Sequence, residues 1–131
     1  MPRRILIIIG HPDPSPKRLC GALADSYAEG ARSANHHVRR IDIAALDFPF
    51  LRTMEEFQNG KVPTSLEEAA HAIRDADHIV FIFPLWLGTM PALLKAFLEQ
   101  LMRPGIAFAY PEAGKTGFAK TLLKSRSVAS W

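Results

Sequence analysis

The fold of this chain is decided by residues 79–97, which read Ile-Val-Phe-Ile-Phe-Pro-Leu-Trp-Leu-Gly-Thr-Met-Pro-Ala-Leu-Leu-Lys-Ala-Phe. The start of this stretch is apolar and rich in β-branched and aromatic types, which predicts a strand covered on both faces at residues 79–83. Pro84 cannot donate a ladder hydrogen bond, so we expect a loop over residues 84–90. Pro91 then begins a helix whose apolar residues recur at helical spacing. A strand, a loop and a helix in this order are typical of an α/β sheet.

The segments before this stretch alternate in the same way. Residues 5–9 predict a first strand, and residues 38–43 predict a second one. The helix between them is expected to begin at Pro16 with Ser15 as its N-cap. Its predicted buried face consists of positions spaced by four residues, namely Leu19, Leu23, Tyr27 and Ala31.

The stretch between the second and third predicted strands holds one more helix. Residues 44–64 contain prolines, a glycine and several large apolar residues, so they predict an ordered excursion that covers part of a pocket. Residues 65–76 predict a helix with an acidic first turn. Because strands that alternate with helices pair in parallel, we expect a doubly wound α/β sheet in a single domain over residues 1–131.

The last part of the chain is the least regular. Residues 125–131 resemble a strand that is just beginning. Three complete strands are few, since a sheet usually carries about 4–6 strands. We therefore expect that the sheet lacks its last strands, because the chain is C-terminally short or because a partner completes the edge.

Composition excludes several functional classes. The 131 residues are 48% hydrophobic and 22% charged, with a net charge of +3. No apolar run approaches the ~20 residues of a membrane span, so we expect a cytoplasmic protein without membrane insertion. The single cysteine, Cys20, cannot form an internal disulfide, and no Cys/His cluster has metal-ligand spacing. The basic residues are scattered without an aromatic platform, which argues against nucleic-acid binding.

The predicted site lies in the loops that follow the first and third strands. In doubly wound sheets, ligands bind beyond the carboxyl ends of the strands. The loop over residues 10–18 offers polar and basic side chains near a helix N-terminus, where N–H groups attract anions: His11, Ser15, Lys17 and Arg18. It predicts a phosphate site, although it is neither a Walker A sequence nor Gly-x-Gly-x-x-Gly.

The second loop offers apolar faces and backbone N–H groups that suit a planar heteroaromatic ring: Pro84, Leu85, Trp86, Leu87 and Gly88. A phosphate at one loop and a ring at the other suggest a flavin. Plainer interpretations remain open, since Ser15 is also a good N-cap and Trp86 and Leu87 also suit a core or a dimer interface.

Two stretches resemble a known family. Residues 9–15, Ile-Gly-His-Pro-Asp-Pro-Ser, and residues 83–95 resemble the flavodoxin-like NAD(P)H quinone oxidoreductases, and the resemblance extends to Tyr110. It implies a flavodoxin-like fold with strand order 2-1-3-4-5 and a homodimer. It also implies an FMN or FAD cofactor that takes hydride from NAD(P)H and reduces a quinone by two electrons.

The resemblance also implies roles for single positions. The flavin-phosphate loop would contain His11, Ser15, Arg18 and Leu19, and the isoalloxazine loop would contain Pro84, Leu85, Trp86, Leu87 and Gly88. Phe108 and Tyr110 match aromatic positions near the substrate pocket, and no catalytic residue is assigned.

The sequence departs from the family pattern in two places. Cys20 stands where many members have asparagine, and Trp86-Leu87-Gly88 stands where human-type enzymes have a polar residue and two aromatics. We expect Cys20 to be a buried packing residue without a redox role. Members of the family also continue through further strands, a glycine-rich loop and a Tyr/His pair that we do not find here.

Three functional hypotheses follow. The first is a flavin-dependent NAD(P)H oxidoreductase for quinone-like acceptors. The second is a regulatory or ancillary subunit that binds flavin or nucleotide and controls a partner. The third is a truncated form without turnover.

Overall fold

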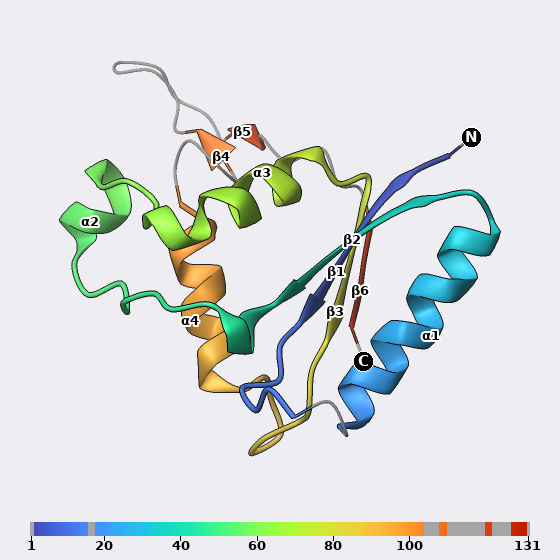
Figure 1. The fold of residues 1–131 in the computed structure, drawn as a ribbon. Helices are drawn as coiled ribbons and strands as arrows, with labels where there is room; N and C mark the ends of the chain where they lie inside the picture. The colour runs from blue at the N-terminus through green and yellow to red at the C-terminus, as the bar shows by residue number, and fades with distance from the viewer. Residues whose placement is uncertain (1, 16–17, 104–107, 110–119, 122–126, 131) are drawn as a thin grey trace.

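The computed structural model describes residues 2–15, 18–103, 108–109, 120–121 and 127–130, and its centre is a parallel sheet (Figure 1). The strand order is β2-β1-β3-β6, and every neighbouring pair in this sheet is parallel. The strands are β1 (Arg4–Ile9), β2 (His37–Asp42), β3 (His78–Ile82) and β6 (Ser127–Ser130). The predicted doubly wound arrangement of the first three strands is therefore confirmed.

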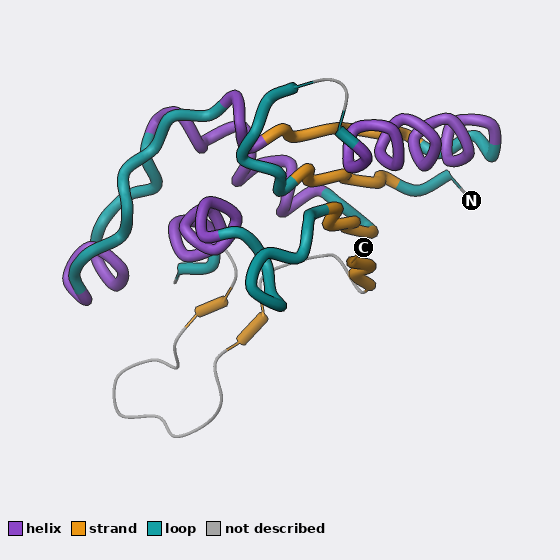
Figure 2. Tube along the Cα trace, turned by 90° about the horizontal axis from the view of Figure 1, so that it is seen from below, coloured by secondary structure: helices purple, strands orange, loops and turns teal. Residues whose placement is uncertain are grey.

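The helix α1 (Leu19–Ser33) covers one face of the sheet, and Figure 2 shows it on the opposite side of the strands from α4 (Ala92–Leu101). Its buried positions are small residues, Cys20, Ala24, Ala28 and Ala31, which pack with the alternate β1 residues Ile5, Ile7 and Ile9. The predicted stripe is confirmed at Ala31, and Leu23 and Tyr27 are half-buried and pack against this core. It was wrong at Leu19, which is 73% exposed. Small side chains let the helix axis approach the sheet, and larger ones lie beside the contact.

The start of α1 also differs from the prediction. The N-cap is Arg18, with extended backbone and no side-chain capping bond, so the N-cap predicted at Ser15 was wrong, and the predicted first helical residue, Pro16, lies outside the described residues. The Ser15 N–H instead donates to the carboxylate of Asp13, which keeps the chain in a turn before the helix.

The opposite face carries α3 (Glu67–Asp75) and α4 (Ala92–Leu101), and it contains the larger core. The other β1 residues, Leu6 and Ile8, contact this core together with Phe97 of α4. The predicted helices at 65–76 and from 91 are confirmed within one or two residues, since the first turn before α3 is a 3-10 helix, η2 (Thr64–Leu66).

The excursion between β2 and α3 is ordered, as predicted. It contains η1 (Ile43–Ala45) and α2 (Met54–Asn59), whose N-cap Thr53 accepts a bond from the Glu56 N–H. Together with α4 the excursion lines a cavity of about 530 Å³.

The C-terminal part adds to the sheet. Residues 127–130 pair with β3 from His78↔Ser127 to Phe81↔Ser130, so the segment that resembled the beginning of a strand is a fourth parallel strand. The strand that this segment predicts is therefore confirmed beside the three complete strands. A separate antiparallel pair joins β4 (Phe108–Ala109) to β5 (Lys120–Thr121).

Candidate functional site

The two predicted loops leave the same edge of the sheet side by side. β1 pairs with β3 up to Ile9↔Ile82, and the Gly10 N–H then donates to the Ile82 carbonyl at 2.8 Å. A Cβ atom on Gly10 would lie 2.6 Å from Leu94 Cδ2, so glycine permits α4 to approach this edge closely.

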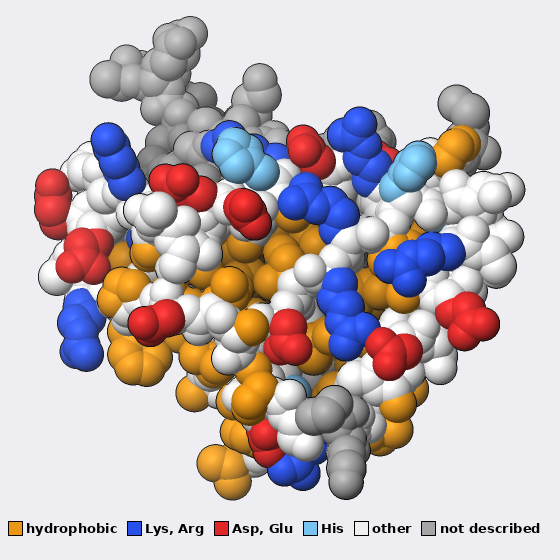
Figure 3. All heavy atoms as spheres, in the orientation of Figure 1, with side chains coloured by type: hydrophobic (Ala, Val, Ile, Leu, Met, Phe, Trp, Pro, Cys, Tyr) orange, Lys and Arg blue, Asp and Glu red, His pale blue; other side chains and the backbone are white. Residues whose placement is uncertain are grey.

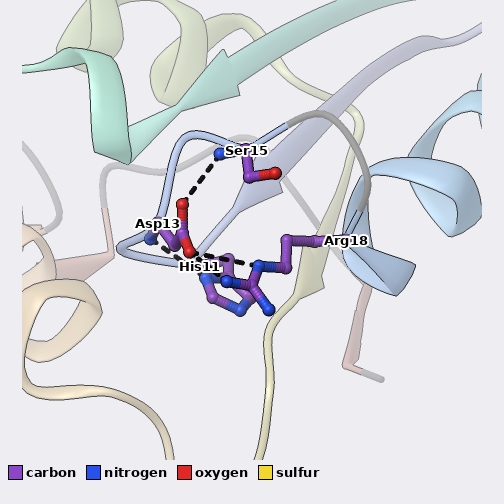
Figure 4. A network of polar contacts seen from close by, with 4 residues as sticks. All are labelled: His11, Asp13, Ser15 and Arg18. Atoms are coloured by element: carbon purple, nitrogen blue, oxygen red, sulfur yellow. Dashed lines mark hydrogen bonds and ion pairs between the residues drawn. The ribbon is translucent and has the colours of Figure 1, made fainter.

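The first loop is organised around the carboxylate of Asp13 (Figure 4). The Asp13 N–H donates to His11 Nδ1 at 3.0 Å, and Asp13 Oδ1 accepts the Ser15 N–H at 2.9 Å. Asp13 Oδ2 accepts Arg18 Nε at 3.1 Å and forms an ion pair with Arg18 Nη2. The predicted residues His11, Ser15 and Arg18 are thus brought together, and Asp13 is the residue that joins them.

These bonds also set the charge of the loop. The Ser15 N–H and then the Arg18 guanidinium lower the pKa of Asp13 from its ordinary value. At neutral pH the group is therefore a carboxylate. Sequence analysis did not select Asp13, although an aspartate two residues before a serine in a proline-rich loop is a signal for this type of turn.

The first loop borders a cavity of about 180 Å³. Its far wall comes from α1 and from the carboxyl end of β2, with Asp25, Arg40 and Asp42. Arg40 Nη1 donates to Asp25 Oδ1 at 2.5 Å, and Asp42 Oδ1 accepts the Ala44 N–H at 3.2 Å. These residues were also missed, and only the position of Asp42 at a strand end could have indicated it.

The second loop contains a tight turn whose backbone is strained. Trp86 and Thr89 exchange both backbone hydrogen bonds, at 2.8 and 3.1 Å, across Leu87 and Gly88. Both central residues have positive φ, 52° and 78°, as in a type I′ turn. The left-handed conformation is strained for a leucine, and the Leu87 side chain lies fully in solvent, at 105% exposure.

The two loops touch through one ring contact. The His11 and Trp86 ring centroids lie 5.5 Å apart at an interplanar angle of 83°. Trp86 and Leu87 line a second, open cavity of about 590 Å³ with Met90 and Lys95. His11 lines the first, polar cavity and Trp86 lines the second, apolar one, so this ring contact joins the linings of the two cavities.

The remaining predicted residues differ in their placement. Leu19 is exposed and does not line the polar cavity, because the helix begins at this residue and turns its small face inward. Leu85 is 71% exposed, and neither it nor Pro84 lines the two cavities. For Phe108 only the backbone in β4 is described, and Tyr110 and Lys17 lie outside the described residues. Cys20 is buried as predicted, and burial raises the pKa of its thiol.

A buried polar cluster holds the excursion against α4. Gln100 Nε2 donates to the Pro49 carbonyl at 2.7 Å, and Arg103 Nη1 donates to the Glu56 carbonyl at 3.2 Å. Arg103, only 3% exposed, also bonds Gln100 through its carbonyl and side-chain oxygens. Burial lowers the pKa of Arg103, while Glu56 opposes this shift.

The described part of the chain contains neither a metal site nor a membrane-spanning helix. Among its residues no group of three or more His, Cys, Asp or Glu side chains could hold a metal ion. No helix in the same ranges is long and apolar enough to cross a membrane.

Comparison with known proteins agrees with this geometry. Residues 3–130 match the sequence profile of a family described by its flavodoxin-like fold. The chain belongs to this family. Within the flavodoxin-like family, a Haemophilus influenzae protein described as an uncharacterized NAD(P)H oxidoreductase is 28% identical over 88% of this chain and 58% of its own length. An FMN-dependent NADH:quinone oxidoreductase of Photobacterium profundum is 27% identical over 85% of this chain and 58% of its own.

A solved structure shows the same fold. The NAD(P)H:quinone oxidoreductase from Methanothermobacter marburgensis superposes with a TM-score of 0.79 at 23% identity, over 99% of this chain and 66% of that one. The chain thus spans about 58% of the length of these two curated relatives and 66% of this structure.

Proposed function

We propose that this protein binds FMN at the carboxyl edge of its sheet and serves as an NAD(P)H oxidoreductase for quinone-like acceptors. The observation that carries the proposal is the pairing of two loops at one edge. One loop aims a backbone N–H and a guanidinium at a single anion, and the other presents an apolar turn beside it.

The donor set of the first loop fits a phosphate monoester. Ser15 N–H and the Arg18 guanidinium already hold a carboxylate, which stands in for the phosphate oxygens. His11 accepts the Asp13 N–H and orients the loop.

The second loop would hold the ring. Trp86, Leu87 and Gly88 present an apolar turn, and we propose that Pro84 and Leu85 support it from the strand end. The bound flavin would supply the hydride chemistry. The chain's own residues would bind it, orient it and exclude water from one of its faces.

The wall of the polar cavity favours FMN over FAD. The same wall carries Asp42, whose Oδ1 accepts a neutral backbone N–H, whereas the charge of Asp25 is paired with Arg40. The second phosphate of FAD would approach the Asp42 carboxylate, whereas FMN ends at the first phosphate. The Photobacterium relative is itself named as FMN-dependent and NADH-using, which supports FMN and NADH here.

We further propose that the protein acts as a single-domain homodimer. Figure 3 shows apolar side chains gathered over the excursion and α4. Phe50 and Met54 of the excursion are 57% and 73% exposed, which suits a surface covered by a partner. Light scattering at several concentrations tests this, and a monomer throughout would contradict it.

A second candidate uses the same site. In it, a flavin bound at this edge would serve the control of a partner without turnover. NADH-driven bleaching of bound flavin separates the two, because only the oxidoreductase reduces it.

The test is a flavin titration followed by tryptophan and flavin fluorescence. FMN should saturate the protein and bind more tightly than FAD. Arg18→Ala should lower the affinity for FMN by about tenfold or more, because a charge-assisted hydrogen bond contributes that much to binding. It should leave the affinity for riboflavin unchanged. Arg39→Ala, an exposed charge on β2, is the matched control. Absence of saturable FMN binding by the folded chain would refute the proposal.

A further inference from the structure

The carboxylate of Asp13 occupies the position that an incoming phosphate needs. Each of its oxygens is engaged, Oδ1 by the Ser15 N–H at 2.9 Å and Oδ2 by Arg18 Nε at 3.1 Å, with Arg18 Nη2 completing a fork (Figure 4). A phosphate cannot take these donors while the carboxylate holds them. The two anions also repel each other at contact distance.

The loop is built so that the carboxylate can leave without unfolding. Pro12 and Pro14 flank Asp13 and restrict the backbone on both sides, so the group is released by rotation about its side-chain bonds. The side chains of Arg18 and Asp13 are 52% and 37% exposed, and exposed ion pairs are weak. The contact is therefore strong enough to compete and weak enough to be displaced.

The neighbouring carboxylate shows that this placement is specific to Asp13. Asp25 lines the same cavity, but it pairs with Arg40 and touches neither Ser15 nor Arg18 in the described contacts. The cavity thus contains one carboxylate on the phosphate donors, that of Asp13, and two away from them, those of Asp25 and Asp42.

We propose that Asp13 is an internal competitor for the flavin phosphate, which occupies the Ser15 and Arg18 donors in the free protein and must be displaced when a phosphorylated flavin binds. This inference rests on the proposed function and adds a determinant of affinity to it. Asp13 would set FMN affinity below what the donors alone provide. It would leave ligands without a phosphate unaffected.

The experiment compares FMN and riboflavin binding in wild type, Asp13→Asn, Asp13→Ala and Asp25→Asn by fluorescence titration. Asp13→Asn removes the charge and keeps an acceptor for the Ser15 N–H, while Asp13→Ala removes both. FMN affinity should rise by about five- to twentyfold in Asp13→Asn, as expected for loss of an exposed ion pair and a competing bond. It should rise at least as much in Asp13→Ala, and riboflavin affinity should change by less than about twofold.

The control decides between specific competition and bulk charge. Asp25→Asn removes the same charge from the same cavity and should change FMN affinity by less than about twofold. The inference is overturned if FMN affinity is unchanged or falls in both Asp13 variants. It is equally overturned if Asp25→Asn or riboflavin shows the same gain. If no variant binds either flavin, the proposed function fails as well. If FMN binds but its affinity does not depend on Asp13, only this inference fails and the proposed function is retained.

Discussion

At the scale of single residues, burial decides the chemistry of Cys20. The thiol lies on the sheet-facing side of α1, 7% exposed, and desolvation raises its pKa above the ordinary value. A neutral, covered thiol is a poor nucleophile. The position of Cys20 is thus a packing position, although it also lines the polar cavity.

We therefore expect native Cys20 to react slowly with iodoacetamide or a disulfide reagent at pH 8, and quickly after unfolding in urea. Because its folded pKa is raised, the thiol contributes stability that is complete below the ordinary cysteine pKa and is lost as pH rises through the raised value. Reaction rates of the thiol, measured with and without urea, check that the folded protein protects Cys20. Equal rates in both states would contradict it.

Strain at Leu87 gives a second prediction at this scale. The left-handed conformation of Leu87, with φ at 52°, destabilises the folded state by about 1–2 kcal/mol. Its side chain is fully exposed, so no burial would be lost on replacement. Leu87→Asn places Asn-Gly in the turn, the favoured pair for type I′. We expect the free energy of unfolding to rise by about 1 kcal/mol, measured as a shift in urea midpoint.

The control for this change is Leu85→Asn, because Leu85 is also exposed but has no positive φ. It should not stabilise the protein. If the loop holds the flavin ring, Leu87→Asn should also weaken riboflavin binding. Such opposite effects on stability and binding would show that the strain is kept for the ligand. A Leu87→Asn protein no more stable than wild type would contradict the strain argument.

At the scale of elements, hydrophobic periodicity predicted which segments form the strands of the sheet. It did not predict where α1 begins or all the residues of its buried face. Runs such as 5–9 and 79–83 have no alternative to a buried strand. The start of α1 depended on whether Ser15 used its oxygen as a cap or its N–H in a turn, which only the position of Asp13 decides. The loops of the site were predictable from topology, whereas Asp25 and Arg40 reach the cavity through tertiary packing.

The contact between α4 and the excursion gives the prediction for this scale. Arg103 is buried and donates to the Glu56 carbonyl and to Gln100. Arg103→Ala removes the bonds to Gln100 and to the Glu56 carbonyl, which keeps the Gly60 N–H as a donor, and it should cost about 2–3 kcal/mol. Lys95→Ala, at an exposed position on α4, is the control.

The loss should be visible locally as well as globally. Because Arg103 and Gln100 hold carbonyls of the excursion, cleavage by a protease within residues 49–59 should accelerate more than global unfolding does. An Arg103→Ala protein with unchanged stability and unchanged cleavage would show that packing alone, without this cluster, fixes the excursion.

At the scale of the whole molecule, the sheet makes one edge out of distant parts of the chain. β1 and β3 are neighbours although some seventy residues separate them, and the pairing Ile9↔Ile82 places the phosphate loop beside the ring loop. β6 adds a fourth strand to the other side of β3. Both interior strands are therefore paired on each side, which anchors the two loops to the most protected part of the sheet.

This arrangement predicts which loops each ligand should protect from hydrogen exchange. FMN should slow amide hydrogen exchange in residues 10–15 and in residues 84–90 together, whereas riboflavin should protect mainly residues 84–90, because it lacks the phosphate. At FMN concentrations near 100 times its dissociation constant, the free energy of unfolding should rise by about 2.7 kcal/mol. Hydrogen exchange read by mass spectrometry, with thermal unfolding beside it, provides both measurements. FMN protection confined to one loop would mean that the edge is two separate sites, because a ligand that bridges β1 and β3 must order both loops.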